Sequence, residues 1–453
     1  MSDTEGSAPG DIASGRLDPE TLARNFVDKH PPLDFKGAIV ESSRCYFCFD
    51  APCVQACPTG IDIPSFIRKI QTGNLKGSAL DILNANIMGG MCARVCPVEE
   101  LCEEACVRNF GERQPVRIGA LQRYATDHLM AAGIQPFRRA APSGRRIAVV
   151  GAGPAGLSCA HRLSMLGHEV VVFEARDKPG GLNEYGIAAY KTTGDFAQKE
   201  VGFILSLGGI TVETGKALGR DVHLVDLRRD FDAVFIGIGL GGTRELGVDG
   251  EDLDGVEDAV AFIERLRQAD DLTQVPIGRR VVVIGGGNTA VDAAVQARLL
   301  GAEEVTLVYR RGPQQMGATW VEQEWAQING VTIRHWAMPR RLIGFKGQVK
   351  EVECEHTQLD EAGRLVGTGD TFRLFADQVF KAIGQKLVPD PLIEDARETL
   401  EIAGGRIVVN AERQTSLPDV WAGGDCIEGR DLTVVAVEDG KVAAHAIDRA
   451  LRA

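Results

Sequence analysis

The sequence predicts an α/β protein in which a helical, cysteine-rich N-terminal domain precedes two Rossmann-like nucleotide-binding domains. Eight of the 11 cysteines lie between Cys45 and Cys106, where apolar residues recur at helical spacing. Two later segments, starting at Ile147 and Val281, each contain a buried-strand run, a glycine-rich turn and a helical pattern. Two such βαβ openings indicate two nucleotide-binding domains, and a chain of 453 residues is long enough for two or three domains.

The overall composition excludes several classes of function. A net charge of −13 disfavours a nucleic-acid-binding surface, which would need a basic patch. The sequence has no apolar run long enough to cross a membrane, and its acidic start does not resemble a signal peptide. We therefore expect a cytoplasmic protein with no nucleic-acid or membrane partner. In a reducing compartment, a dense group of cysteines points to metal rather than to disulfides.

The cysteines fall into two groups with metal-ligand spacing. These are Cys45, Cys48, Cys53 and Cys57, followed by Cys92, Cys96, Cys102 and Cys106. Cys57 and Cys96 each precede a proline, as in ferredoxin-type 4Fe–4S motifs. Structural zinc also uses cysteine pairs, but it usually adds histidine or repeats the Cys-x2-Cys pair. The pattern favours two 4Fe–4S clusters over zinc and over purely structural cysteines.

The spacing also suggests how the thiolates are shared. A compact loop supplies three ligands, and the cysteine before proline usually joins the other cluster. On this basis Cys45, Cys48 and Cys53 hold one cluster, and Cys106 returns to it. Cys57 is then a ligand of the second cluster. There it joins Cys96 and Cys102, and spacing alone favours Cys92 as the fourth ligand.

The first glycine-rich turn follows a strand and opens a helix, as a pyrophosphate-binding loop does. Its glycines allow a tight turn, close approach of the phosphates and close helix–strand packing. Glu174 ends the next strand and is placed to bind ribose hydroxyls. The expected FAD-binding residues are Gly151, Gly153, Pro154, Ala155, Gly156, Glu174, Gly181 and Leu182.

The second glycine-rich turn repeats this geometry but lacks an acid at the ribose position. The strand that follows ends in Arg310 and Arg311, and arginine at this place accommodates a 2′-phosphate. We therefore expect NADPH, with NADH as the alternative. The expected nicotinamide-binding residues are Gly285, Gly287, Asn288, Thr289, Ala290, Arg310 and Arg311.

Hydride transfer from nicotinamide to flavin needs no acid–base pair from the protein, whose task is to hold and orient the cofactors. No residue is therefore assigned as a catalytic nucleophile. Cys159 lies in the helix after the first loop and has no partner nearby in sequence, which disfavours disulfide-reductase chemistry.

The order of cysteine block, FAD loop and NADPH loop resembles the small subunit of glutamate synthase and the electron-input part of dihydropyrimidine dehydrogenase. The resemblance covers nearly the whole chain. Asp50–Thr59, Asp62–Ile67 and Ile118–Arg123 are similar to the pyrimidine branch. In dihydropyrimidine dehydrogenases a glutamine at the place of Gln122 is a cluster ligand, whereas glutamate synthase subunits typically have glutamate there.

This resemblance implies a different ligand set from the one that spacing favours. One cluster would be held by Cys45, Cys48, Cys53 and Cys106, and the other by Cys57, Cys96, Cys102 and Gln122, with Cys92 left as a nearby thiol. The resemblance also implies that the FAD domain is split around the NAD(P)H domain. Gly424 and Asp425 then lie at the ribityl or phosphate side of the flavin, and Thr433–Gly440 lies beside its ring.

The resemblance further implies a partner. The complete enzyme reduces uracil or thymine in an FMN-containing barrel, and this chain has no residues left for one. We therefore expect a hetero-oligomer with an FMN-barrel catalytic subunit. The separate bacterial subunit is often described as NADH-dependent, whereas Arg310 and Arg311 resemble the NADPH type. The rival hypotheses are a subunit that feeds glutamate synthase or another reductase, and a scaffold without turnover.

The expected domain organisation follows from these features. The segment Ala140–Gly144 is a linker candidate, and the strand and turn Val420–Asp425 indicate that the chain returns to the first nucleotide domain. The expected parts are a flexible tail at 1–20, a helical iron–sulfur domain at 21–143, an FAD-binding domain at 144–262 and 385–453, and an NAD(P)H-binding domain at 263–384.

Overall fold

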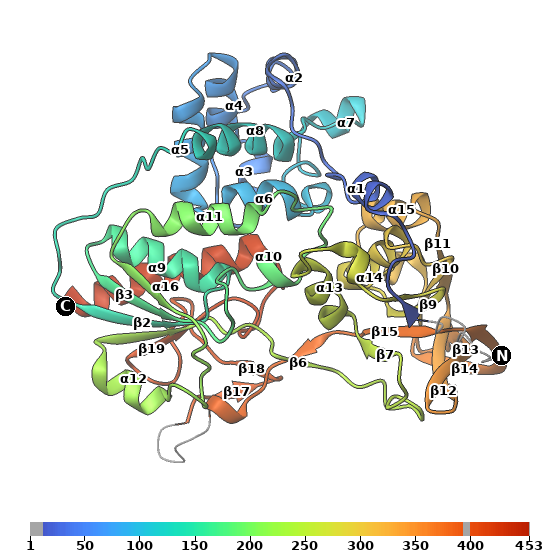
Figure 1. Ribbon diagram of the computed structural model, residues 1–453. Coiled ribbons are helices and arrows are strands. Elements are labelled where there is room, and N and C mark those ends of the chain that lie inside the picture. The colour runs from blue at the N-terminus through green and yellow to red at the C-terminus, as the bar shows by residue number, and fades with distance from the viewer. Residues whose placement is uncertain (1–11, 393–398, 453) are drawn as a thin grey trace, which may run out of the picture. The chain divides into compact units, whose positions relative to one another are not determined.

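The chain forms two compact units, and the computed structural model (Figure 1) describes residues 12–392 and 399–452. Of the described residues, the larger unit comprises 29–184, 191–242, 386–392 and 399–452. The smaller unit comprises 12–28, 185–190 and 243–385. The chain passes between the units after residues 28, 184 and 190, and again within the short strands β6 (Gly242–Thr243) and β16 (Gln385–Lys386).

The larger unit begins with short helices joined by the loops that carry the cysteines. These helices are α2 (Phe35–Ser42), α3 (Pro52–Ala56), α4 (Ile63–Gln71), α5 (Leu75–Ala85), α6 (Gly89–Val95), η1 (Val98–Glu100), α7 (Arg108–Glu112) and α8 (Ile118–Ala131). Side-chain caps define several of their starts: Asp62 accepts a hydrogen bond from the Ser65 amide at 3.0 Å, and Asn74 accepts one from the Gly77 amide at 2.9 Å.

A five-stranded parallel sheet forms the rest of the larger unit, in the order β19-β5-β2-β3-β4. Its strands are β2 (Arg146–Val150), β3 (Glu169–Phe173), β4 (Ile210–Glu213), β5 (Ala233–Ile236) and β19 (Val420–Ala422). The associated elements are α9 (Pro154–Met165), α10 (Leu182–Tyr185), α11 (Phe196–Leu205), α12 (Leu224–Asp230), η4 (Asp390–Leu392), β17 (Ile402–Ala403), β18 (Arg406–Ile407) and α16 (Thr433–Arg452). Because β19 pairs with β5, the predicted return of the chain to the first nucleotide domain is confirmed.

The helices of the cysteine-rich region share one apolar core with helices of the first nucleotide-binding fold. Phe66 of α4 lies in the same buried cluster as Leu157 of α9, Ile204 of α11 and Val437 of α16. Lys441 of α16 adds polar contacts, because its Nζ donates to the carbonyl of Thr59 at 3.2 Å and to that of Ala85 at 2.9 Å. The loops that hold the cysteines are therefore packed directly onto the first nucleotide-binding fold.

The smaller unit also contains a five-stranded parallel sheet, in the order β11-β10-β9-β15-β7. Its strands are β7 (Val256–Asp258), β9 (Arg280–Gly285), β10 (Glu304–Tyr309), β11 (Val331–His335) and β15 (Gln378–Ala382). The helices are α13 (Ala259–Arg267), η2 (Leu272–Gln274), α14 (Asn288–Leu299), η3 (Pro313–Gln315) and α15 (Trp320–Ile328). An antiparallel sheet of β12 (Ala337–Phe345), β13 (Gln348–Leu359) and β14 (Leu365–Phe375) was not anticipated from the sequence.

The expected flexible tail is wrong for residues 12–20, while residues 1–11 lie outside the described part. Strand β1 (Ile12–Ala13) pairs with β8 (Ile277–Gly278), and helix α1 (Pro19–Asn25) starts at an Asp18 cap. Residues 21–28 belong to the smaller unit rather than to the iron–sulfur domain, because Leu22 packs into the core of that unit. The main segment of the smaller unit begins at residue 243, upstream of the expected start of the NAD(P)H-binding domain at 263.

Within residues 12–392 and 399–452, no helix is both long enough and apolar enough to span a bilayer.

Helix α16 packs closely against α9, and Gly440 lies at their contact (Figure 1). A Cβ at Gly440 would overlap the backbone of Ala155, so Gly440→Val forces the two helices apart. We expect a loss of about 1–3 kcal/mol in unfolding free energy, measured by thermal and denaturant melts. Gly429→Val is the control, since a Cβ there meets no atom within 4 Å. Equal stabilities of the two variants would contradict this packing.

Candidate cofactor and iron–sulfur sites

Four cysteines of the expected first cluster line one cavity. Cys45, Cys48, Cys53 and Cys106 line this cavity together with mainly apolar residues, which include Ile63 and Ile67 of α4 and Ile118 of α8. Burial, reinforced by the neighbouring Cys106 and Cys45 thiols, raises the pKa of Cys53 to about 12. These thiols oppose one another's ionisation, so the thiolate form needs a bound cationic group.

A second cavity is lined by the other expected ligands. Cys57, Cys96, Cys102 and Gln122 all line it, and so does Cys92. The hydrogen bond between the Cys92 and Cys96 thiols, followed by burial, raises the pKa of Cys96 well above its ordinary value. Cys92 and Gln122 are thus both within the second cavity, and the choice between them as fourth ligand stays a prediction.

The side-chain amide of Gln122 has a defined orientation. Gln122 is 7% exposed, and its Nε2 donates a 2.7 Å hydrogen bond to the carbonyl of Gly89 at the start of α6. This bond makes the oxygen the end of the amide that remains available to bind iron. The hydroxyl of Thr59 lies 3.3 Å from the Cys57 sulfur, within reach of a hydrogen bond to a cluster ligand.

The residues of both cavities fit iron–sulfur clusters. Their linings offer cysteine sulfurs, to which the second cavity adds the side-chain amides of Asn86 and Gln122, and neither lining contains histidine. Each cavity draws its cysteines from separate loops. Among the described residues, no group of three or more His, Cys, Asp or Glu side chains is close enough to hold a single metal ion.

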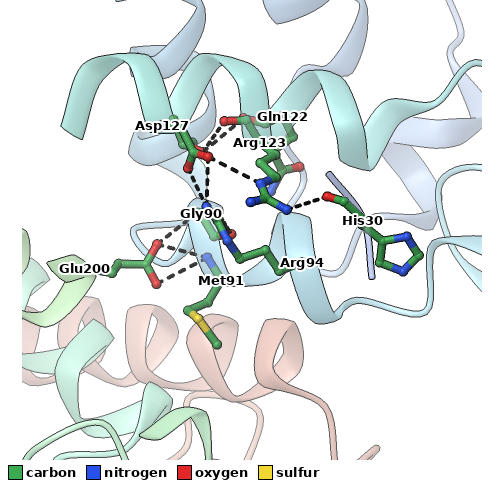
Figure 2. A network of polar contacts seen from close by, with 9 residues as sticks. His30, Gly90, Met91, Arg94, Gln122, Arg123, Asp127 and Glu200 are labelled. Carbon is green, nitrogen blue, oxygen red and sulfur yellow. Dashed lines mark hydrogen bonds and ion pairs between the residues drawn. The ribbon is translucent and has the colours of Figure 1, made fainter. Parts of the chain in front are cut away.

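A buried polar network holds helix α6, which lies between the second cavity and the flavin-type fold (Figure 2). Glu200 of α11 is fully buried, and its carboxylate accepts hydrogen bonds from the amides of Gly90 at 2.8 Å and Met91 at 3.1 Å. Arg94 donates to both oxygens of Asp127 at 2.8 Å. These residues carry no local sequence signal, because their partners lie far away along the chain.

Burial and the neighbouring groups of this network together set the pKa of Glu200. Burial raises the pKa of Glu200 to about 8, although the two amides and Arg94 lower it. Arg94 also stacks on Phe196, with its guanidinium carbon 3.4 Å from the ring centroid. The start of α6, and with it the Gly89 carbonyl that orients Gln122, is therefore held from α11 and α8.

The first glycine-rich loop has the geometry expected of an FAD-binding turn. Gly151 has a φ of 98°, and a Cβ at Gly156 would overlap the Gly151 carbonyl. Gly153 caps α9, which places Pro154, Ala155 and Gly156 in its first turn. Glu174 at the end of β3 accepts a 2.8 Å hydrogen bond from the Ala152 amide.

The other expected flavin-binding residues lie in the loops that follow strands β3 and β19. Gly181 lies against Gly153, whose Cα a side chain at Gly181 would crowd, and the neighbouring Leu182 is 38% exposed. Asp425 follows β19, and burial, reinforced by Asp431, raises its pKa to about 6.

The turn at Gly424 is held in place by the carboxylate of Asp439, which no sequence motif marks. The amide of Gly424 donates to Asp439 at 3.0 Å, and Arg413 pairs with that carboxylate at 2.8 Å. These residues gather at the carboxyl ends of parallel strands, where nucleotides bind in such sheets.

The smaller unit carries the second loop. Gly285 has a φ of 154° at the end of β9, and Gly287 caps α14, whose first turn contains Asn288, Thr289 and Ala290. Arg310 and Arg311 follow β10, with Arg310 exposed and Arg311 half-buried. The Oδ1 of Asn288 is buried and has no hydrogen-bond partner, as expected of a polar group that awaits a ligand.

Two family models match the chain. The model described as "Pyridine nucleotide-disulphide oxidoreductase" covers residues 145–440. The model described as "Dihydropyrimidine dehydrogenase domain II, 4Fe-4S cluster" covers residues 22–134. Together they include both cavities and both glycine-rich loops.

Two curated relatives match along nearly their full lengths. The NAD-dependent dihydropyrimidine dehydrogenase subunit PreT of Salmonella typhimurium is 34% identical over 425 residues, which is 94% of this chain and 97% of the relative. The NADPH-type glutamate synthase small chain of Escherichia coli is 32% identical over 443 residues, 93% of each chain. Among solved structures, Mycobacterium tuberculosis FprA in complex with NADPH matches with a TM-score of 0.56 and 23% identity, covering 68% of this chain and 85% of its own.

Fold and sites together define an electron-transfer oxidoreductase subunit that uses FAD, 4Fe–4S iron and a nicotinamide nucleotide. More specifically, the chain belongs to the family of the dihydropyrimidine dehydrogenase subunits, which is related to the glutamate synthase small chain. The predicted fold class, a helical iron–sulfur domain before two Rossmann-like domains, is confirmed.

The raised pKa of Glu200 predicts a pH-dependent stability. Between the ordinary value of 4.5 and about 8, the folded chain keeps a proton that the unfolded chain has lost. Stability therefore falls as pH rises through this window. Glu200→Gln keeps an oxygen for both amides but cannot ionise. As the pH rises from 5 to 9, the unfolding free energy of Glu200→Gln should therefore gain on the order of 2 kcal/mol relative to that of the parent chain. Denaturant unfolding measures this difference.

The control for this prediction is the exposed Glu428, whose change to Gln should leave the pH profile unaltered. Parallel pH profiles for the parent chain and Glu200→Gln would show that the buried carboxylate is ionised throughout, against the assigned pKa.

Proposed function

We propose that this chain is the electron-input subunit of a dihydropyrimidine dehydrogenase. It binds NAD(P)H and FAD and holds two 4Fe–4S clusters. It delivers electrons to an FMN-barrel partner that reduces uracil or thymine at the 5,6 double bond. Two dihydropyrimidine dehydrogenase relatives, at 34% identity over 94% of the chain, support this assignment.

The observation that carries the proposal is the composition of the second cavity. Its lining combines Cys57, Cys96 and Cys102 with the buried amide of Gln122. The oriented amide oxygen supports the ligand set that the family resemblance implies for the pyrimidine branch. A glutamate at this place would instead favour the glutamate synthase branch, to which the 32% identical relative belongs.

The protein's own residues have binding and insulating roles in this function. The loop at Gly151–Gly156 and the turn at Gly424 hold the flavin, and Arg310 and Arg311 receive the 2′-phosphate of NADPH. Bound FAD supplies the conversion of a two-electron donor into single electrons. The apolar walls of the two cavities keep water from the clusters, and the core shared by α4, α9 and α16 keeps the cluster loops next to the flavin fold.

The proposed ligand set predicts opposite results for two neighbouring variants. Cys92→Ala should keep both clusters, whereas Gln122→Ala should change the spectrum or reduction potential of one cluster, because an iron ligand is lost. Gln122→Glu is the conservative control, since a carboxylate oxygen can replace the amide oxygen. Iron and sulfide analysis with EPR provides the readout. Loss of a cluster in Cys92→Ala would favour the spacing-based ligand set instead.

The function is tested by co-expressing the chain with an FMN-barrel subunit and following NADPH and NADH oxidation with and without uracil. We expect uracil-dependent oxidation, with NADPH preferred. Cys96→Ala should abolish it while leaving ferricyanide reduction by NAD(P)H intact, because that reaction needs only the flavin. Absence of uracil-dependent oxidation beside an active barrel subunit, or turnover of glutamine plus 2-oxoglutarate with a glutamate synthase large subunit, would overturn the proposal.

A further inference from the structure

Asn86 is a buried polar residue in the wall of the second cavity. It follows α5, is 0% exposed, and lines the cavity together with Cys57, Cys96 and Cys102. Its backbone is fully used: the amide donates to the carbonyl of Ile82 at 2.8 Å, and the carbonyl accepts from the amide of Gly89 at 3.0 Å. The backbone of Asn86 is therefore held in the link between α5 and α6.

The orientation of the Asn86 amide follows from its one bonded partner. The amide of Met88 donates to Oδ1 at 3.0 Å. A donor can pair only with the oxygen end, so the Nδ2 end must point the other way. The Nδ2 is buried and has no hydrogen-bond partner. Among the described residues lining the two cysteine cavities, Asn86 alone has such an orphaned side-chain atom.

Leaving this group unsatisfied is costly. A buried donor without a partner costs about 1–3 kcal/mol, and native chains retain such groups mainly where an ion, a water molecule or a function accounts for them. A lone water is a poor explanation, because a buried water needs two to four polar partners. The wall beside Asn86 supplies mostly sulfur and apolar atoms, including Ile61, Ile63 and Val434.

We propose that the Nδ2 of Asn86 donates a hydrogen bond to a sulfur of the second cluster and thereby raises its reduction potential. This inference rests on the proposed function, because it requires a cluster in the second cavity. Hydrogen bonds to the sulfurs are one of the factors that set cluster potentials. Reduction adds negative charge to the cluster, so an N–H donor stabilises the reduced form more than the oxidised form.

The lining of the first cavity differs in this respect. Its described lining residues include Cys45, Cys48, Cys53 and Cys106, but no side chain with an orphaned buried donor. The effect of Asn86 should therefore be confined to the second cluster, which makes the first cluster an internal reference in the same molecule.

The test uses Asn86→Asp in the purified full-length chain. Aspartate keeps an oxygen for the Met88 amide but replaces the N–H donor with an acceptor. We expect the reduced-to-oxidised ratio of the second cluster at a fixed potential to fall by at least about tenfold, which is ~59 mV for a one-electron couple. EPR-monitored redox titration measures the reduction potentials of both clusters, and the potential of the first cluster should not change.

Asn84→Asp is the matched control. It introduces the same charge two residues earlier in α5, at an exposed side chain, and should leave both potentials close to those of the parent. An unchanged second-cluster potential in Asn86→Asp, or equal shifts in Asn86→Asp and Asn84→Asp, would overturn the inference while leaving the cluster assignment in place.

A second measurement does not depend on a variant that folds. In the parent chain labelled with ¹⁵N-asparagine, pulsed EPR of the reduced second cluster should detect a weak coupling to ¹⁵N, because the side-chain nitrogen of Asn86 lies against a cluster sulfur. Absence of that coupling would contradict the proposed bond. Iron and sulfide analysis of the parent chain tests the proposed function separately, because a chain that binds only one cluster contradicts the two-cluster assignment itself.

Discussion

The burial of thiols that must ionise to bind iron is the constraint on which the rest of this structure depends. Burial raises the pKa of Cys53 to about 12 and raises those of Cys96 and Cys102 well above the ordinary value. A charged sulfur in such a place is stable only beside a compensating positive centre. Folding of the cysteine loops and loading with iron are thus energetically linked, and the surrounding helices must hold the loops in a binding geometry.

That geometry depends on the flavin-type fold as much as on the cysteine helices. Glu200 of α11 binds the start of α6, Lys441 of α16 binds the carbonyls of Thr59 and Ala85, and one apolar core joins both regions. The second cavity therefore lies within a single packed body rather than in a detachable module. Gln122 and Asn86 are both oriented by backbone groups near the junction of α5 and α6, so a shift of α6 would disturb both amides at once.

The sequence was informative where a local pattern carries the chemistry. The cysteine spacing and the glycine-rich turns each lie within a short segment, and the two Rossmann-like folds followed from them. Glu200 and Asn86 gave no such signal, because their roles come from partners on other elements or from a cavity. The pairing of β1 with β8 joins residues far apart along the chain, so residues 12–20 were wrongly expected to be flexible. The antiparallel sheet of β12, β13 and β14 was not predicted, because its residues contain no nucleotide-binding motif.

The central claim is that the chain holds two 4Fe–4S clusters, one of which has Gln122 among its ligands. Mössbauer spectroscopy of the ⁵⁷Fe-loaded chain tests this most directly, because an iron bound by an amide oxygen differs from irons bound only by sulfur. The account predicts two clusters and one iron site per chain with a distinct isomer shift, which Gln122→Ala alters and Cys92→Ala does not. A single cluster, or irons that are all sulfur-ligated, would contradict it.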